Sequence, residues 1–515
     1  MNTNKLNYLI VVIIFIFLLA GIFSYMMIEP HWYDENMYIS AGVLIQNYSL
    51  YKDFAFLQMP YLPFIYGIIY KLTGTTYYLL TAELINFFFM IISCLLILLI
   101  SYKLTENLFI SLGSMLLFIL NQIVIYIMGY SANTILPIAF SLLGFYLYII
   151  SVSTISVKRL GIFFSGMAIA LAIGTKLYYA ALIPPFFIIS LLYPKSLAFK
   201  KRIIKNLIPL SIGVLIGLLP VFYYFITDAA IFLFNNFDYH ILNTVYRELE
   251  GHTMTMSLIS KIHYGKRILR YPSNISLLIG ILFLFMTLST EKQNIKNNLL
   301  RFIQMENLLL VLIILLTIIA AFTPTPLWLH YFALPFPYVI ILLSSWYRHL
   351  ETLNKKLTNL MILCLIIASF LSSGEKLFDR LNQTFYANQW TSLKVHQIAK
   401  EIKSYIGKID KNQKIATLYP LYALEGGLPI YKELSTGHFI FRLGELIPED
   451  IVYKYCYVSS PNIYELLEKD PPKAILVETG KDDSYKDFIK FAEEKNYEKI
   501  QKDFDRMILY INSEK

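Results

Sequence analysis

Eleven stretches of this 515-residue chain are apolar over a length that crosses, or nearly crosses, a lipid bilayer. A membrane-spanning helix needs about 20 predominantly apolar residues. Runs of this kind lie near 8–28, 77–101, 108–128, 131–151, 160–175, 177–193, 207–227, 273–290, 306–322, 331–346 and 359–374. Only 15% of the residues are charged, against about 25% in a typical soluble protein. The sequence therefore predicts a polytopic α-helical membrane protein.

The charged residues are divided unevenly along the chain. Residues 1–374 contain 23 Lys/Arg and 13 Asp/Glu, whereas residues 375–515 contain 21 and 22. A membrane domain rich in basic residues is therefore expected over 1–374, followed by a nearly neutral soluble domain over 375–515. The net charge of +9 is explained by basic loops at the membrane surface and gives no indication of nucleic-acid binding.

The basic residues in the loops predict the orientation. With a cytoplasmic N-terminus, the inner loops carry 15 Lys/Arg and the longer outer loops carry 8. Cytoplasmic loops are enriched in basic residues, so this orientation is favoured. It places residues 29–76, the loop 228–272 and the C-terminal domain on the outer face. The abundance of Ile, Lys and Asn is typical of an AT-rich genome and indicates a bacterial inner membrane.

The C-terminal domain has an α/β pattern. "KVHQIAKEIKSYI", "NIYELLEKD" and "DFIKFAEEKN" have helical periodicity, and "KIATLYP", "KAILVET" and "RMILYI" are rich in the apolar residues that strands favour. The sequence therefore predicts a C-terminal soluble α/β domain.

Two adjacent acids, Asp34 and Glu35, follow the first apolar run within "EPHWYDENMY". One interpretation is a helix cap or a solvated loop acid, since Asp is favoured at helix N-termini. The other is a general base at the membrane surface, because partial desolvation by Trp32 and Tyr33 raises the pKa of a carboxyl group. The dipeptide alone does not decide between them. "ENMYISAGVLIQNY" and "PYLPFIYGIIYKLTG" then predict two juxtamembrane helices within residues 29–76.

The order of these features resembles the first outer loop of polyprenyl-phosphate-sugar-dependent glycosyltransferases of the GT-C fold. The protein O-mannosyltransferases and the lipid A aminoarabinose transferases are the most similar in pattern. The resemblance extends to "LYKDF", "AIALAIGTK" (168–176) and "LHYFALPFPY" (329–338). It implies a GT-C-like fold of about 11 transmembrane helices. It also implies that Asp34 is the catalytic base, with Glu35 as its catalytic neighbour and Asp53 in a substrate-binding stretch.

Two positions depart from the pattern of the aminoarabinose transferases. Those enzymes carry Glu-Lys-Pro before the second juxtamembrane helix, and the lysine binds the lipid phosphate. This chain has "LQMPYLP", with Gln58 and Met59 instead. The family's acid between spans three and four is also replaced, and "GYSANTILP" offers Asn133. The phosphate ligand must therefore come from elsewhere, or the donor differs.

Other residues expected on the outer face are candidates for binding substrate. Lys and Arg bind phosphate, whereas Tyr and His bind sugar hydroxyls. Snorkelling, basic loops beside anionic headgroups and the aromatic belt are alternative explanations. The candidates are Lys176, Lys266, Arg267 and Arg270 for phosphate, and Tyr239, His240, His330 and Tyr331 for the sugar or the interface.

The leading hypothesis is a glycosyltransferase that moves a monosaccharide from a polyprenyl-phosphate donor to an acceptor hydroxyl, with inversion and with Asp34 as general base. The expected partners are the lipid-linked sugar, membrane lipids, and a glycan, lipid or protein acceptor. No cofactor is expected, and the dispersed His and acidic residues predict no metal site. A lipid or polysaccharide transporter or flippase is the alternative, but the deep parts of the predicted spans lack Asp, Glu, Lys and Arg. A non-catalytic membrane scaffold is a third possibility.

Overall fold

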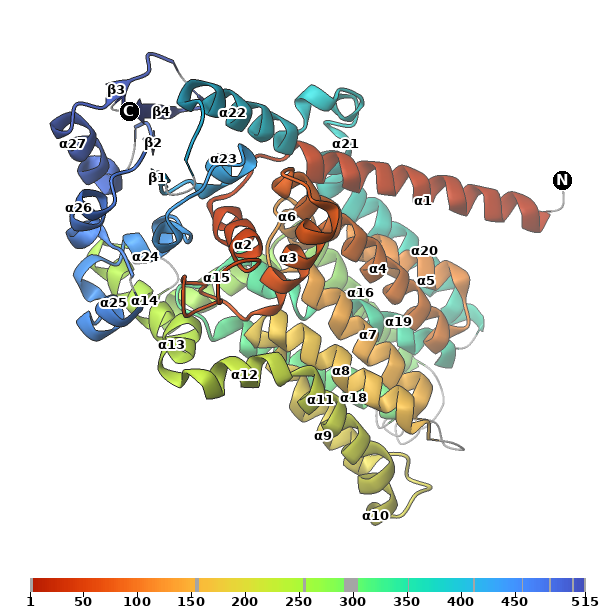
Figure 1. Ribbon diagram of the computed structural model, residues 1–515. Coiled ribbons are helices and arrows are strands. Elements are labelled where there is room, and N and C mark those ends of the chain that lie inside the picture. The colour runs from red at the N-terminus through yellow and green to blue at the C-terminus, as the bar shows by residue number, and fades with distance from the viewer. Residues whose placement is uncertain are drawn as a thin grey trace.

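The computed structural model describes residues 3–152, 157–252, 256–290, 304–350, 352–410, 413–455, 457–480, 483–502 and 504–513. Most of the predicted inner loop 291–305 lies outside the described residues. Helices α1 to α21 form a membrane region, and α22 to β4 form a C-terminal region at one end of it (Figure 1).

The helices of the membrane region vary widely in length. They are α1 (Thr3–Ile28), α2 (Tyr33–Leu44), α3 (Tyr61–Thr73), α4 (Tyr78–Thr105), α5 (Leu108–Ile119), α6 (Gln122–Met128), α7 (Ile135–Ser151), α8 (Arg159–Thr175), α9 (Ile183–Leu192), α10 (Phe199–Arg202), α11 (Ile208–Gly217), α12 (Leu219–Thr227), α13 (Ala229–Leu233), α14 (Tyr239–Leu249), α15 (Leu258–Leu269), α16 (Pro272–Thr290), α18 (Met305–Phe322), α19 (Phe336–Ser345), α20 (Thr352–Ser369) and α21 (Glu375–Phe378).

The apolar helices agree with the predicted spans. Within the described residues, 4 helical segments are long and apolar enough to cross a membrane, and 3 further pairs meet the same criterion if each bent pair is one span. Four shorter apolar segments, Ile135–Ser151, Arg159–Thr175, Leu177–Leu192 and Pro272–Phe283, match the remaining runs. Together these groups account for all eleven apolar runs of the sequence, so the polytopic α-helical membrane fold is confirmed.

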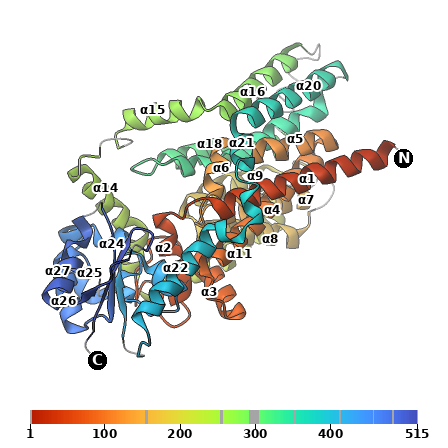
Figure 2. The ribbon, with the colours of Figure 1, turned by 90° about the horizontal axis from the view of Figure 1, so that it is seen from above.

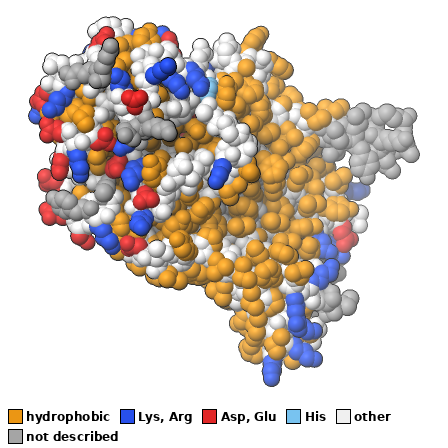
Figure 3. Space-filling view, viewed as in Figure 1, with side chains coloured by type: hydrophobic (Ala, Val, Ile, Leu, Met, Phe, Trp, Pro, Cys, Tyr) orange, Lys and Arg blue, Asp and Glu red, His pale blue; other side chains and the backbone are white. Residues whose placement is uncertain are grey.

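The molecular surface has the pattern of a protein embedded in a bilayer. Figure 3 shows a broad apolar surface over the helix bundle, with charged side chains gathered over the C-terminal region and, at the far end, over α10. The exposed apolar side chains of the bundle include Phe88, Leu95 and Leu99 of α4. A bilayer accommodates such a band, whereas in water it would be exposed at high cost.

Close helix packing in the bundle depends on glycine. A Cβ added at Gly166 of α8 would lie 2.2 Å from the carbonyl oxygen of Leu210, and one added at Gly213 of α11 would lie 2.0 Å from that of Phe163. No side chain fits at either position. Small residues allow membrane helices to approach backbone to backbone, so α8 and α11 form one rigid pair.

Helix α2 turns away from the first span and is enclosed by protein. The axes of α1 and α2 differ by 90°, as expected for a helix that follows a span along the membrane surface. The sequence predicts that this helix lies in the lipid interface, but nearly all of its residues are buried. It packs against α3 and against α23 (Pro420–Glu425) of the C-terminal region. Close packing with α3 is possible because Gly42 and Gly67 face each other.

The C-terminal region contains the predicted α/β elements. Its sheet has the order β1-β2-β4-β3, with β1 and β2 parallel and the other pairs antiparallel. The strands are β1 (Ile415–Thr417), β2 (Ala474–Glu478), β3 (Glu498–Lys499) and β4 (Met507–Ile511), and the helices are α22 (Thr391–Ile406), α23, α24 (His438–Phe441), α25 (Glu449–Tyr455), α26 (Ser460–Lys469) and α27 (Lys486–Glu494). Each predicted strand and helix is present, and β3, α23, α24 and α25 are additional.

A buried carboxylate joins the two regions. Glu425 at the end of α23 accepts a hydrogen bond from the backbone N–H of Leu79, in the first turn of α4, at 2.7 Å. Its other oxygen lies 2.5 Å from His396 Nδ1 of α22. A carboxylate near a helix N-terminus satisfies a free N–H group and interacts favourably with the helix dipole. Helix α22 packs against α1 and α23 packs against α2, so the C-terminal region is held against the start of the bundle (Figure 2).

Candidate active site

Asp34 is the second residue of α2 and is only half-buried. The charges that act on it most strongly are those of Arg442, Lys176 and Arg247. The surrounding protein raises the pKa of the Asp34 carboxyl group, because burial disfavours the charged form, and the three cations partly oppose this rise. Asp34 is therefore a carboxylate in a partly dry, positively charged setting.

The three cations come from different parts of the chain. Lys176 follows α8, Arg247 lies in the last turn of α14, and Arg442 follows α24 in the C-terminal region. A charge cluster assembled from two membrane-region segments and the C-terminal region exists only when both regions are docked.

Lys176 is buried and lies among aromatic rings. Its side chain is 6% exposed, and its Nζ lies 5.9 Å from the ring centre of Tyr178 and 5.7 Å from that of Tyr331. Aromatic faces attract cations within about 6 Å. His330 packs edge-on against Tyr331, with ring centres 4.3 Å apart. The structure thus brings together Lys176, His330 and Tyr331, three of the residues that the sequence singles out.

The two arginines are also held by neighbouring side chains. Arg442 donates to Asn243 Oδ1 at 2.7 Å and to the hydroxyl of Tyr239 at 3.4 Å. Arg247 lies over the ring of Trp328, 5.3 Å from its centre. The Nε atom of each arginine is buried and has no hydrogen-bond partner in the described structure. Each arginine therefore has one N–H donor that the described protein does not satisfy.

Glu35 has a different role from its neighbour. It is 2% exposed, and its two carboxylate oxygens accept hydrogen bonds from the backbone N–H groups of Trp32 and Ser131, each at 2.6 Å. The first bond caps the start of α2. The second ties α2 to the segment between α6 and α7. Glu35 therefore fixes the position of Asp34.

The two positions that depart from the aminoarabinose transferase pattern contact each other. Asn133 Nδ2 donates to Gln58 Oε1 at 3.1 Å, and Asn133 Oδ1 accepts from the hydroxyl of Tyr38 at 3.1 Å. A neutral amide pair therefore stands where the family pattern has two acids, and Met59 stands at the position of its lysine. The positive charge near Asp34 comes instead from Lys176, Arg247 and Arg442.

Other predicted residues lie outside this cluster. Asp53 accepts a hydrogen bond from the backbone N–H of Ser49 at 2.7 Å and closes a turn. His240 follows Tyr239, and their rings are 5.2 Å apart. The three basic residues Lys266, Arg267 and Arg270 are exposed at the end of α15. Figure 2 shows α15 along the outside of the bundle.

No sequence pattern marks Arg247 or Arg442 as a site residue. Each is a lone arginine, in "VYRELEG" and "FIFRLGEL", and neither belongs to a motif. Only the docking of the C-terminal region brings Arg442 toward Asp34. No group of three or more possible metal ligands is present in the described part of the chain.

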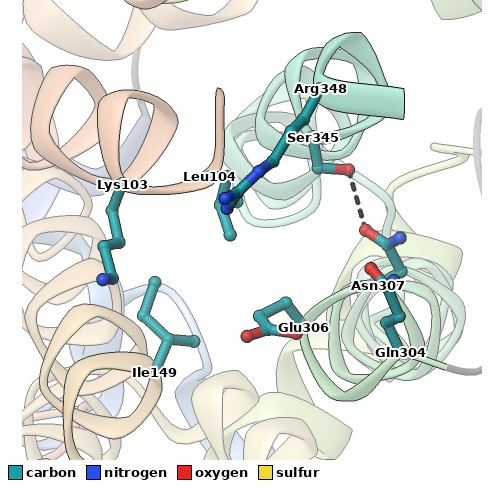
Figure 4. Close-up of a pocket in the computed structure, with 8 residues that line it drawn as sticks. All are labelled: Lys103, Leu104, Ile149, Gln304, Glu306, Asn307, Ser345 and Arg348. Carbon is teal, nitrogen blue, oxygen red and sulfur yellow. Dashed lines mark hydrogen bonds between the residues drawn. The ribbon is translucent and has the colours of Figure 1, made fainter. Parts of the chain in front are cut away.

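A polar cavity of about 260 Å³ lies away from this site. Lys103, near the end of α4, lines it together with Glu306 and Arg348, and Asn307 bonds to Ser345 at its wall (Figure 4). Asp34 and the C-terminal region lie near the start of α4, and this cavity lies near its end. Helix α4 has 28 residues. With a rise of about 1.5 Å per residue, its two ends lie about 40 Å apart.

Comparison with known proteins identifies the fold. No family model and no curated protein matches the sequence. The structure superposes on ArnT from Cupriavidus metallidurans bound to undecaprenyl phosphate, with a TM-score of 0.64 and 11% identity, over 99% of this chain and 98% of that one. The apo state of the same ArnT gives 0.64 and 10%.

The chain has the GT-C fold. The fold class that the sequence predicts is therefore confirmed, including the α/β domain at the C-terminal end. The oligosaccharyltransferase of Archaeoglobus fulgidus also superposes, with a TM-score of 0.47 and 10% identity, over 97% of this chain and 74% of that one. That score is too low to bear on function.

Glu35 is expected to make the stability of the protein depend on pH. Burial raises its pKa from 4.5 to about 7, although the bonds from Ser131 and Trp32 oppose this shift. Between these two values the native state binds more protons than the unfolded state, so stability falls as pH rises, by about 3 kcal/mol in total. Glu35→Gln is expected to give a shallower fall in melting temperature between pH 4.5 and 7.5.

Glu465 provides the control, because it is an exposed glutamate of α26. Glu465→Gln should keep the wild-type dependence of melting temperature on pH. An unchanged slope in Glu35→Gln would show that Glu35 is not a titrating group of the native state.

Proposed function

We propose that this protein is a glycosyltransferase that moves a monosaccharide from a polyprenyl-phosphate donor to an acceptor hydroxyl, with Asp34 as general base. The observation that carries the proposal is the carboxylate of Asp34 among Lys176, Arg247 and Arg442. It occurs in a fold shared with ArnT, which was solved with undecaprenyl phosphate. No cofactor is needed for this reaction.

The three cations would hold the donor phosphate. Arginine and lysine form charge-assisted hydrogen bonds to phosphate, and arginine does so through two parallel bonds. The buried, unpartnered Nε atoms of Arg247 and Arg442 are suited to this. When the bond to the sugar breaks, negative charge grows on the phosphate, so these cations would stabilise the transition state more than the ground state.

Asp34 would accept the proton of the attacking hydroxyl. The acceptor oxygen forms a bond to the anomeric carbon, the bond from that carbon to the phosphate oxygen breaks, and the polyprenyl phosphate leaves with the electron pair. The hydroxyl proton passes to Asp34. A single displacement with one base gives inversion at the anomeric carbon. Glu35 would be a positioning residue, because it fixes the start of α2.

The reaction would take place on the outer face of a bacterial inner membrane. The basic loops favour a cytoplasmic N-terminus, and this orientation puts Asp34 and the C-terminal region outside. The donor would enter from the bilayer with its chain among the apolar helices. A sugar attached to its phosphate would then face the C-terminal region.

Loss of the Asp34 carboxylate is expected to abolish transfer. Asp34→Asn keeps the shape of the side chain but cannot accept the proton, and the loss of a general base lowers the rate by about 10²–10⁴-fold. The assay is transfer of labelled sugar from undecaprenyl-phosphate donors to envelope material by the purified protein. Because burial raises the pKa of Asp34, kcat/KM should rise with pH through a midpoint above the usual Asp range.

Asp379→Asn is the matched control, since Asp379 is exposed on the C-terminal side of α21. It should keep wild-type transfer. Wild-type activity in Asp34→Asn would remove Asp34 from the mechanism. A wild type that binds the lipid yet transfers no sugar would favour a transporter or a scaffold.

Arg442 is expected to act on both the donor and the base. Arg442→Gln removes one cation from the phosphate site, and we expect undecaprenyl phosphate to bind about tenfold more weakly. Arg442 also lowers the pKa of Asp34, so its loss should move the acid limb of kcat/KM to higher pH. Arg442→Lys should largely restore the position of that limb.

Two further arginines test where the phosphate binds. Arg348→Gln, beside the distant cavity, should leave binding unchanged. A loss of binding in Arg267→Gln, with none in Arg442→Gln, would move the phosphate to α15 and contradict the proposed site.

A further inference from the structure

A cluster of tyrosines, histidines and carboxylates lies where the chain leading into α2 meets the C-terminal region. We call it the tyrosine cluster. It consists of His31, which precedes α2, of Tyr33, the first residue of α2, and of Tyr419, Tyr422, His438, Glu478, Tyr485 and Asp505 from the C-terminal region. The proposed donor site uses none of these residues.

The hydrogen bonds within the cluster join the two regions. The hydroxyl of Tyr33 donates to both oxygens of Glu478, at 3.0 and 3.1 Å. The hydroxyl of Tyr422 donates to Asp505 at 3.0 Å. Tyr33 is 50% exposed, whereas Tyr422 is 1% and Tyr485 is 2% exposed. The cluster therefore combines buried aromatic rings with the exposed side chains of Tyr33 and Asp505.

The position of the cluster in the sheet is one where ligands commonly bind. Strands β1 and β2 are parallel, so their carboxyl ends lie at the same edge. Tyr419 follows β1, and Glu478 ends β2. Asp505 enters the same edge just before β4, because Met507 pairs with Glu478. In open α/β sheets, ligands bind outside the carboxyl ends of the parallel strands.

The same edge faces the reaction centre. Tyr33 directly precedes Asp34 in α2, and His438 and Arg442 lie at the two ends of α24. One short helix therefore contributes to the tyrosine cluster at its start and to the cations around Asp34 at its end. A molecule bound to the tyrosine cluster would therefore present some of its groups to Asp34. The proposed reaction needs the acceptor hydroxyl at that place.

The chemistry of the cluster fits a sugar. A sugar hydroxyl both donates and accepts hydrogen bonds, and carboxylates, tyrosine hydroxyls and imidazoles satisfy it. The electron-rich faces of aromatic rings pack against the weakly positive C–H groups of a sugar ring. Neither Glu478 nor Asp505 forms a salt bridge within the described residues. Two such carboxylates repel a phosphorylated group.

We infer that the tyrosine cluster is the acceptor site and that the acceptor is a saccharide without phosphate at the attacked residue. The inference rests on the proposed glycosyl transfer and adds the class of acceptor to it. The attacking oxygen belongs to a sugar hydroxyl held by Glu478 and Asp505 beside Asp34. Its proton passes to Asp34 as the glycosidic bond forms.

The first experiment identifies the class of acceptor. Purified protein and labelled undecaprenyl-phosphate sugar are incubated with an envelope fraction from the organism that carries this chain. Portions of that fraction are treated beforehand with periodate, with protease or with phosphatase. Periodate, which cleaves the vicinal diols of sugars, should abolish labelling, and the other two treatments should not.

The second experiment tests the residues with the same labelled donor and the untreated fraction. Glu478→Gln and Asp505→Asn remove the charge that holds the hydroxyls but keep the side-chain shape. Each is expected to raise the acceptor concentration for half-maximal rate about tenfold, with the maximal rate within about twofold of wild type. Glu465→Gln, at an exposed glutamate of α26 that is not part of the tyrosine cluster, should change neither quantity. Melting temperatures confirm that the variants are folded.

The outcomes separate the two proposals. Labelling that protease or phosphatase abolishes, or an unchanged half-saturation in both variants, would overturn the saccharide acceptor site while leaving glycosyl transfer by Asp34 in place. Failure to label any fraction, combined with failure to bind undecaprenyl phosphate, would overturn the glycosyltransferase proposal and the acceptor site with it.

Discussion

The arrangement of this molecule around Asp34 depends on one buried carboxylate, that of Glu35. Its two oxygens bind the backbone N–H groups of Trp32 and Ser131. The first bond starts α2 where the chain leaves the first span, and the second fixes α2 to the turn before α7. A buried carboxylate that accepts two such bonds cannot also serve as an exposed base, so the two adjacent acids have different roles. Glu35 fixes the position of α2, and Asp34 is the acid that we propose as the general base.

The setting of Asp34 balances two opposing effects. Burial favours the neutral acid, and the nearby cations favour the carboxylate. A base needs a raised pKa, but it must still be charged when the acceptor arrives. Arg442 makes this balance depend on the C-terminal region, which is anchored through Glu425 to the start of α4. In the proposed mechanism, docking of the C-terminal region supplies Arg442 as a cation for the donor phosphate. The same docking lowers the pKa of Asp34 through Arg442 and places the tyrosine cluster beside Asp34.

Sequence and structure agree where local chemistry decides the outcome. Apolar length predicts the spans, because a bilayer demands about 20 apolar residues for each. Alternating and apolar runs predict the strands of the C-terminal region, and the pattern after the first span predicts the GT-C fold. Asp34 stands out in the sequence because an acid at that place is unusual beside a membrane.

Tertiary contacts could not be predicted in this way. Arg442 lies 408 positions after Asp34, and no periodicity relates them. Gln58 and Asn133 look like two independent departures from a pattern, yet they bind each other. The basic group on α15 has the stronger sequence signal for phosphate, because Lys266, Arg267 and Arg270 are clustered. The structure leaves that group exposed and surrounds Asp34 with three cations that are isolated in the sequence.

The most direct test is an experimental structure of the protein bound to undecaprenyl phosphate. We expect the phosphate within hydrogen-bonding distance of Arg442 and Lys176, with the lipid chain among the apolar helices and the carboxylate of Asp34 facing the open side of the phosphate. A phosphate bound to Arg267 and Arg270 on α15, with Asp34 remote from it, would contradict the account.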